Sequence, residues 1–204
     1  MASGPSLRRI DGRRLRSART KQAILDAYLA LLREGTQIPT AAQIAERAGC
    51  SVRSVFERFS DLHALRVAAT DYAFLQGTAK ATEQDFTGDR QTRLKKHVGG
   101  RAWICERWLP LWRSLNVNQG ESSDLRSRIF LIRQAILKRI ELMYRPELST
   151  LPETERRQTL VAIESLIDFE CWARMREDSG LPVEEAVEVW LTAIDRLLPP
   201  TPVS

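Results

Sequence analysis

The stretch Thr40–Phe59, TAAQIAERAGCSVRSVFERF, predicts two short helices joined by a tight turn. Thr40 followed by Gln43 forms a capping box, which places the start of the first helix at this point. Gly49 ends that helix, because glycine tolerates the positive φ that helix C-termini often require, and Ser51 can cap the second helix. Apolar side chains recur at helical spacing on both: Ile44, Ala45 and Ala48, then Val55, Phe56 and Phe59. The pattern is a helix-turn-helix, which also occurs in helical domains that do not bind DNA.

The composition is that of a globular protein with a sizeable core, because 43% of its 204 residues are hydrophobic and 28% are charged. The longest uncharged run, residues 35–45, is far shorter than the ~20 apolar residues of a membrane span. Three widely spaced cysteines argue against a disulfide framework and predict a reduced, cytoplasmic protein. With two histidines and no paired cysteines, we expect neither a zinc site nor another cofactor.

The positive charge is concentrated at the N-terminal end of the chain. Residues 1–66 contain 12 Lys and Arg against 6 Asp and Glu, whereas residues 67–204 contain 19 against 20. A localised positive field suits a polyanionic partner. Residues 1–18 carry much of it and lack apolar periodicity, so we expect a disordered basic arm. The arm could follow DNA phosphates, or it could serve only as a solubilising end.

Helical patterns account for the rest of the chain, and no segment predicts a strand. The expected helices are about 20–33, 61 to the low eighties, 89–109, 122–143, 153–177 and 182–197. Pro110 is expected to end the third of these and Pro182 to begin the last. A turn at residues 85–88 separates the helix-turn-helix region from the remainder.

The segments ILDAYLALLREG and PTAAQIAERAGCSVRSVFERFSDLHAL resemble the N-terminal DNA-binding domain of TetR-family transcriptional regulators over about residues 20–66. The resemblance implies an all-α fold, with a three-helix DNA-binding domain at 19–66 and a helical effector-binding and dimerisation domain at 67–204. It also implies that Thr40 contacts the DNA backbone and that the second short helix is the recognition helix.

Arg53 is the best candidate for a bidentate contact with guanine. Glu57 could accept a hydrogen bond from cytosine, or could pair with a neighbouring arginine, which is the favoured interpretation. Phe56 stands where the family pattern has an aromatic residue that can carry a hydroxyl group, and Arg58 stands in place of its histidine. The predicted DNA-binding residues are Thr40, Ser51, Val52, Arg53, Ser54, Phe56, Glu57 and Arg58.

An aromatic-rich segment around residues 103–112 has two interpretations. Large aromatic side chains dominate any helical core, but small-molecule cavities are also mainly apolar. Because the resemblance implies an effector pocket in this domain, the candidate pocket residues are Trp103, Cys105, Trp108, Trp112, Phe130, Phe169 and Trp172. Cys105 could sense oxidants, although an inert buried thiol is the favoured interpretation.

Two apolar stripes on the segment 153–177 require cover on two sides, either from the core of one protomer or from a second protomer. In TetR-type proteins the last two long helices form a dimer interface. The candidate interface residues are Leu166, Phe169, Ala173, Val187, Trp190 and Ile194.

No nucleophile–base pair or phosphate loop is recognisable, so an enzyme is not expected. The sequence predicts a dimeric regulator, most simply a repressor, that binds a palindromic operator and is released by a small, mainly apolar ligand. Activation in place of repression stays open. The alternative is an architectural DNA-binding protein without ligand gating.

Overall fold

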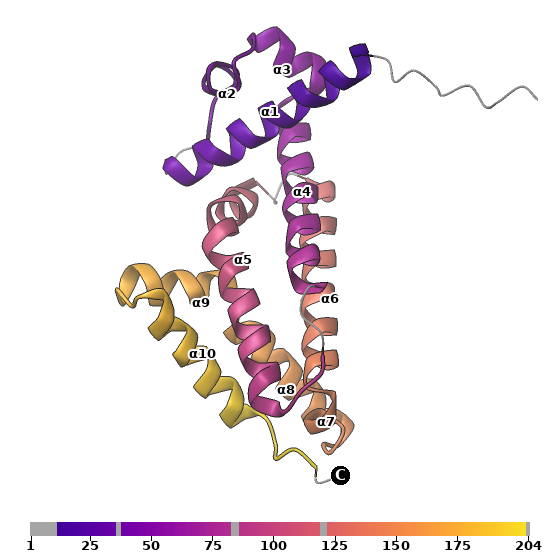
Figure 1. Ribbon diagram of the computed structural model, residues 1–204, viewed down its shortest axis with the longest axis vertical. Helices are drawn as coiled ribbons and strands as arrows, with labels where there is room; N and C mark the ends of the chain where they lie inside the picture. Colours follow the sequence, from indigo (N-terminus) through magenta and orange to yellow (C-terminus); the bar gives the residue numbers. More distant parts are fainter. Residues whose placement is uncertain (1–11, 36–37, 83–85, 119–121, 203–204) are drawn as a thin grey trace, which may run out of the picture. The chain divides into compact units, whose positions relative to one another are not determined.

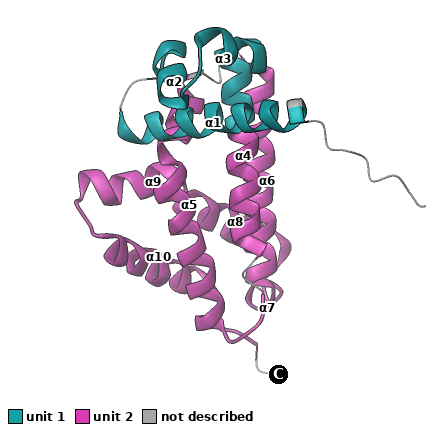
Figure 2. Ribbon diagram, turned by 45° about the horizontal axis from the view of Figure 1, so that its top comes forward, with its two compact units in different colours: residues 1–69 teal, residues 70–204 magenta. Residues whose placement is uncertain are grey.

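The computed structural model describes residues 12–35, 38–82, 86–118 and 122–202, and the regular structure in these ranges is helical, which confirms the all-α expectation (Figure 1). The elements are α1 (Gly12–Glu34), α2 (Ala41–Ala48), α3 (Val52–Arg58), α4 (Leu62–Thr82), α5 (Arg90–Asn118), α6 (Ser123–Met143), α7 (Arg145–Leu148), α8 (Glu153–Leu166), α9 (Phe169–Ala173), the π-helix η2 (Arg174–Asp178) and α10 (Val183–Leu197). The chain forms two compact units that meet within α4, between Ala69 and Thr70 (Figure 2).

In the first unit α1 packs against α2 and α3, and the predicted caps are present. The Thr40 hydroxyl accepts a hydrogen bond from Gln43 N at 3.3 Å, and Thr40 N donates to Gln43 Oε1 at 2.9 Å. Gly49 ends α2 with φ at 66°, and Ser51 Oγ accepts from Ser54 N at 3.1 Å. Local sequence therefore sets the positions of both short helices.

The basic arm is partly helical, which corrects the expected disorder of residues 12–18. Helix α1 begins at Gly12 and continues without a break to Glu34. Arginine, leucine and alanine, which dominate this segment, have high helix propensity even without a buried face. Residues 1–11 of the expected arm lie outside the described residues.

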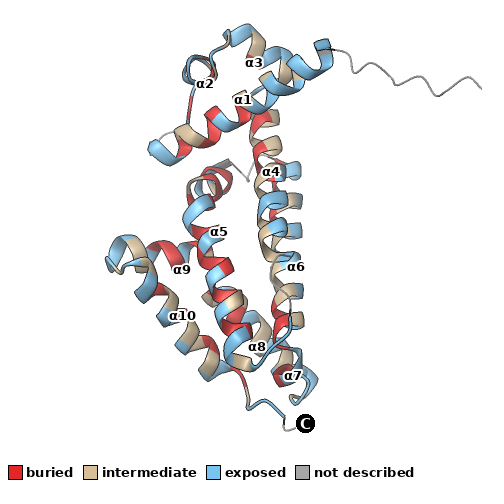
Figure 3. Cartoon of the chain, in the orientation of Figure 1, coloured by how far each residue is buried: buried red, intermediate tan, exposed pale blue. Residues whose placement is uncertain are grey.

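Helix α5 is the centre of the second unit, where it packs against α6, α9 and α10. Buried residues recur along its length (Figure 3). The predicted end at Pro110 is wrong, because α5 continues through it to Asn118. Proline removes one intrahelical hydrogen bond, but Leu111, Trp112 and Leu115 beyond it are all buried. Their burial in the core outweighs that local cost.

The segment 153–177 is not a single helix, which corrects a second expectation. Helix α8 ends at Leu166, and Asp168 caps α9 by accepting a hydrogen bond from Glu170 N at 2.7 Å. The carbonyl of Ile167, between the two helices, accepts a hydrogen bond from Arg101 Nε at 2.8 Å. The break is thus stabilised by a side chain from α5, which lies 66 residues away in the sequence.

A buried ion pair links the beginning of α5 to α7. Arg93 Nη2 lies 2.6 Å from Glu147 Oε1, and Nη1 lies 2.9 Å from Oε2. Thr201 donates to the same carboxylate at 2.6 Å, so the segment after α10 is held at this point as well. The pair is enclosed, with 4% of the Arg93 side chain and none of the Glu147 side chain exposed.

Candidate DNA-binding surface and ligand cavity

The start of α3 carries polar and charged groups on its solvent side. The Arg53 side chain is 87% exposed, and its Nε lies 3.0 Å from Glu57 Oε1. Glu57 also lies 3.5 Å from Arg58 Nη1. Such exposed ion pairs contribute little to stability. Arg53 can therefore exchange Glu57 for another hydrogen-bond acceptor at low cost.

Phe56 is 45% exposed, which corrects its expected burial with Val55 and Phe59. Val55 and Phe59 stand four positions apart and fill the inner side of α3, so Phe56 falls at the edge of that side. Val52, one turn before Phe56, is 40% exposed. The outer side of α3 therefore presents an apolar pair beside the charged one.

A polar hollow beside α3 includes three α1 residues that the sequence-based site omitted. Arg16, Ser17 and Thr20 of α1 border it together with Glu57 and Arg58 of α3. The Nε atom of Arg58 is buried and has no hydrogen-bond partner. The sequence signal was the basic segment before residue 19, but only the start of α1 at Gly12 gives Arg16 a defined position.

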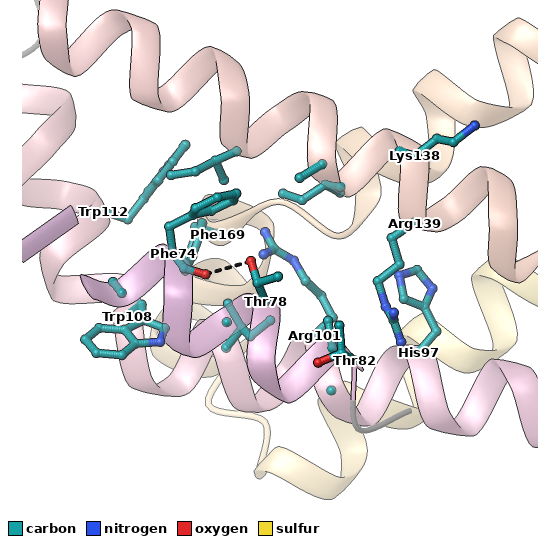
Figure 4. A pocket seen from close by; sticks show the side chains of 18 of the residues that line it. Phe74, Thr78, Thr82, His97, Arg101, Trp108, Trp112, Lys138, Arg139 and Phe169 are labelled. Carbon is teal, nitrogen blue, oxygen red and sulfur yellow. Dashed lines mark hydrogen bonds between the residues drawn. The ribbon is translucent and has the colours of Figure 1, made fainter. Parts of the chain in front are cut away.

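The second unit contains a partly open cavity of about 360 Å³, within the ~300–1,000 Å³ range of small-molecule sites. Residues of α4, α5 and α6, together with Phe86 between α4 and α5 and Phe169 of α9, form its wall (Figure 4). The large apolar side chains that sequence analysis missed are Phe74, Phe86, Ile104, Leu111, Leu115, Ile132, Ile136 and Leu142. Ile132 and Ile136 stand four positions apart, so one side of α6 faces the cavity.

Three of the predicted pocket residues, Trp108, Trp112 and Phe169, line the cavity, and Trp112 stacks on Phe169 with ring centroids 4.8 Å apart. Four do not. Trp103 is 37% exposed and Phe130 is 60% exposed, whereas Cys105 and Trp172 are fully buried elsewhere in the core.

Helical spacing along α5 separates the residues that line the cavity from those that do not. His97, Arg101, Ile104, Trp108 and Leu115 follow one another at intervals of three, four or seven residues on the cavity side. The sequence contained this signal, but a cluster of tryptophans alone does not indicate which side of the helix is hollow.

The cavity's histidine is neutral at physiological pH. Burial, together with the positive charges of Arg139 and Arg101, lowers the pKa of His97 to about 3. His97 Nδ1 lies 2.8 Å from the hydroxyl of the buried Tyr144. The hydroxyl groups of Thr78 and Thr82 already donate hydrogen bonds to carbonyl oxygens of their own helix, each at 2.8 Å, so neither hydroxyl hydrogen is available to a ligand.

Cys105 is expected to be unreactive in the folded protein, because burial raises the pKa of its thiol to about 12 and the thiol stays protonated. A disulfide reagent such as dithionitrobenzoate at pH 8 should therefore react with at most Cys50 and Cys171 in the native state. The folded Cys105→Ala variant should show the same number of reacting thiols, at the same rate, as the folded wild-type protein. Loss of a rapidly reacting thiol in that variant would instead support an oxidant sensor.

The candidate interface residues are mostly covered within the protomer. Trp190 and Ile194 of α10 are fully buried, and Ala173 and Phe169 are nearly so. Helix α10 packs its apolar side on α5, and Trp190 contacts Trp172 with ring centroids 4.7 Å apart. Leu166 and Val187 are half-buried. The exposed large apolar residues on α8 and α10 are instead Val161, Val189 and Leu197.

Two other kinds of site were sought in the described ranges. No three His, Cys, Asp or Glu side chains there are grouped so that they could hold a metal ion. None of the described helices combines the length and the apolar character that a bilayer crossing requires.

Comparison with known proteins places the fold. No protein-family model and no curated protein sequence matches the chain. Solved structures do match. A TetR-family regulator from Rhodococcus sp. has a TM-score of 0.69 and 22% identity, covering 87% of this chain and 98% of that one. One from Streptomyces coelicolor has a TM-score of 0.72 and 18% identity, covering 88% and 80%. LfrR from Mycobacterium smegmatis, solved with proflavine, has a TM-score of 0.62 and 19% identity, covering 90% and 99%. The chain thus has the fold of TetR-type regulators.

Proposed function

We propose that this chain is a DNA-binding transcriptional regulator that uses α3 as its recognition helix. The observation that carries the proposal is the exposed start of α3, where 87% of the Arg53 side chain is accessible to solvent. A helix of this kind fits the major groove, where arginine can bind guanine O6 and N7 together. Exposed Phe56 and Val52 could contact thymine methyl groups, and Arg16 and Arg58 supply positive charge for phosphates. Such a regulator would act in the cytoplasm.

The active form is proposed to be a homodimer that reads an inverted repeat. Two-fold dimers are the commonest oligomers, and they place two recognition helices ~34–36 Å apart, one turn of DNA. Exposed Val161 on α8 and Val189 on α10 support an interface on these helices, in place of the buried Trp190 and Ile194.

Ligand gating is the second part of the proposal. The cavity in the second unit is large enough for a small, mainly apolar molecule. A ligand that binds one arrangement of the dimer more tightly than another would shift the protein away from the form that fits its operator. The cavity favours this role over that of an architectural DNA-binding protein, which requires no internal space.

The first experiment measures binding to the DNA that flanks the protein's own gene, by fluorescence anisotropy over a series of salt concentrations. Binding to a near-palindrome ~10³-fold or more tighter than to random DNA would support a specific regulator. Equal binding to both DNAs, weakening steeply with salt, would contradict sequence readout and support the architectural alternative.

Arg53→Ala is expected to weaken operator binding by ~1–3 kcal/mol and to relax the preference at one base position. The reason is the loss of a bidentate contact to one base, which anisotropy with single-base operator variants would reveal. Arg133→Ala, which removes the same charge from the exposed side of α6, is the control and should bind like the wild type. An equal loss of affinity for all operator variants would instead indicate that Arg53 contacts a phosphate and does not read a base.

A further inference from the structure

The charges that line the cavity are all positive. Arg101, Lys138 and Arg139 are in its wall, and no aspartate or glutamate is among the lining residues within the described part of the chain. Lys138 is on the rim, because 63% of its side chain is exposed and it pairs with Glu141 at 2.8 Å. Arg139 is more enclosed, and burial lowers the pKa of its guanidinium. Its Cζ lies 5.2 Å from the centre of the Phe86 ring.

Arg101 is the most enclosed of these cations, with 7% of the residue exposed. Its Nε donates to the carbonyl of Ile167, and its Cζ lies 4.6 Å from the centre of the Phe169 ring. No acidic side chain in the described ranges forms an ion pair with it, and no described group accepts a hydrogen bond from its Nη atoms. A buried cation without an anionic partner is costly. An anion inside the cavity would offset that cost.

The other residues of the cavity wall indicate the chemical character of the ligand that would fit it. Figure 4 shows Arg101 extending from α5 among Phe74, Thr78 and Phe169. Apart from its cations, the wall is largely aliphatic and aromatic. His97 is neutral, and the Thr78 and Thr82 hydroxyls are engaged by their own helix. The cavity therefore offers one deep cationic group in a mainly apolar space.

We propose that the cavity takes an amphipathic anion, an apolar molecule with one carboxylate that pairs with the guanidinium of Arg101. This inference rests on the ligand-binding role proposed above and narrows it from any apolar effector to an acidic one. A carboxylate can accept two parallel hydrogen bonds from one guanidinium group. Such a bidentate, charge-assisted pair is among the strongest interactions that an arginine side chain forms at neutral pH. Arg101 also holds the break between α8 and α9, so a bound carboxylate would act directly on a side chain that stabilises this break.

The test compares three probes with the same hydrocarbon chain and different head groups: decanoate, 1-decanol and decyltrimethylammonium. Binding to the full-length protein is followed by tryptophan fluorescence, because Trp108 and Trp112 line the cavity. Wild-type protein should bind decanoate about 10- to 100-fold more tightly than decanol, the effect of one charge-assisted hydrogen-bonded pair. The cationic probe should bind most weakly.

Three variants assign the preference to Arg101. In Arg101→Gln the decanoate-to-decanol ratio should fall by about 10-fold or more, although Lys138 and Arg139 remain, while decanol binding, which reports an intact cavity, is retained. Arg101→Lys keeps the charge and should keep a preference for decanoate, including if Arg101→Gln fails to fold. Arg133→Gln removes a charge from the exposed side of α6, outside the cavity, and should leave the wild-type ratio unchanged.

Several results would overturn the proposal: equal binding of decanoate and decanol to the wild type, tightest binding of the cation, no binding of any probe, or an unchanged ratio in Arg101→Gln. The assay contains no DNA, so its failure leaves DNA binding untouched. Conversely, if the protein prefers decanoate but shows no specific operator binding, the anion site at Arg101 is supported and the proposed function as a transcriptional regulator is contradicted.

Discussion

Replacing Arg93 by methionine is expected to lower the free energy of unfolding by about 3–5 kcal/mol, because it leaves a buried carboxylate without its cation. Glu147 is completely enclosed and receives two hydrogen bonds from Arg93 and one from Thr201. Arg93 also donates to the carbonyl of Met143 at 2.5 Å, which would lose that partner. Urea unfolding followed by circular dichroism at pH 7 measures the change.

The double variant Arg93→Met with Glu147→Leu is the control, because it removes both charges and should recover most of the lost stability. A loss of less than ~1 kcal/mol in the single variant, the size expected of an exposed pair, would show that the pair is solvated in solution.

The same pair should give a characteristic dependence on pH. Burial acts to raise the pKa of Glu147, but hydrogen bonds from Arg93 and Thr201 outweigh it and the pKa is lowered overall. A carboxyl whose folded-state pKa is lowered contributes stability above its unfolded-state pKa and loses it as the pH falls through the folded-state pKa. In Arg93→Met only burial and Thr201 remain, so the stability difference from the wild type should shrink as Glu147 becomes protonated in acid. A difference independent of pH would indicate lost packing alone.

Trp190→Ala is expected to destabilise the protomer by about 3–5 kcal/mol, because a fully buried indole would leave a large void between α10 and its neighbours. Val189→Asp, at the adjacent exposed position, should leave the protomer's fold intact and weaken association if α10 contributes to the proposed dimer. Urea unfolding at one fixed protein concentration reports stability, and sedimentation velocity reports the oligomeric state.

These two variants separate the core of the protomer from its interface. If Trp190→Ala abolished the dimer with little loss of protomer stability, the interface would lie where the sequence placed it. If Val189→Asp left a dimer fully intact, the interface would lie away from this side of α10.

Local signals predicted the parts of the fold that depend on near neighbours in the chain. The caps at Thr40 and Ser51 and the turn at Gly49 involve groups only a few residues apart, so twenty residues of sequence suffice to place α2 and α3. The expected start of a helix near residue 122 also depends on near neighbours, because the Ser122 side chain caps α6 by accepting a hydrogen bond from Leu125 N at 3.2 Å. Position within α3 likewise placed Arg53 on the exposed start of the helix.

Expectations based on residue type alone were wrong where contacts distant in sequence decide the outcome. Pro110 is a helix-ending residue by its own chemistry, but the buried side chains after it keep α5 helical. The segment 153–177 has continuous helical periodicity, yet Arg101 stabilises a break in it by binding the carbonyl of Ile167. Neither effect is encoded within the local segment.

The same division applies to the candidate site. The sequence by itself determined an all-α chain with a capped helix-turn-helix and an exposed arginine on its second helix, because hydrogen bonds and periodicity within one or two turns specify these features. Only the tertiary structure decided which aromatic residues line a cavity, that Trp190 belongs to the core, and that Arg101 is enclosed without an acid. Burial and electrostatic pairing depend on which elements meet in space, and periodicity indicates that a helix side is covered without showing what covers it.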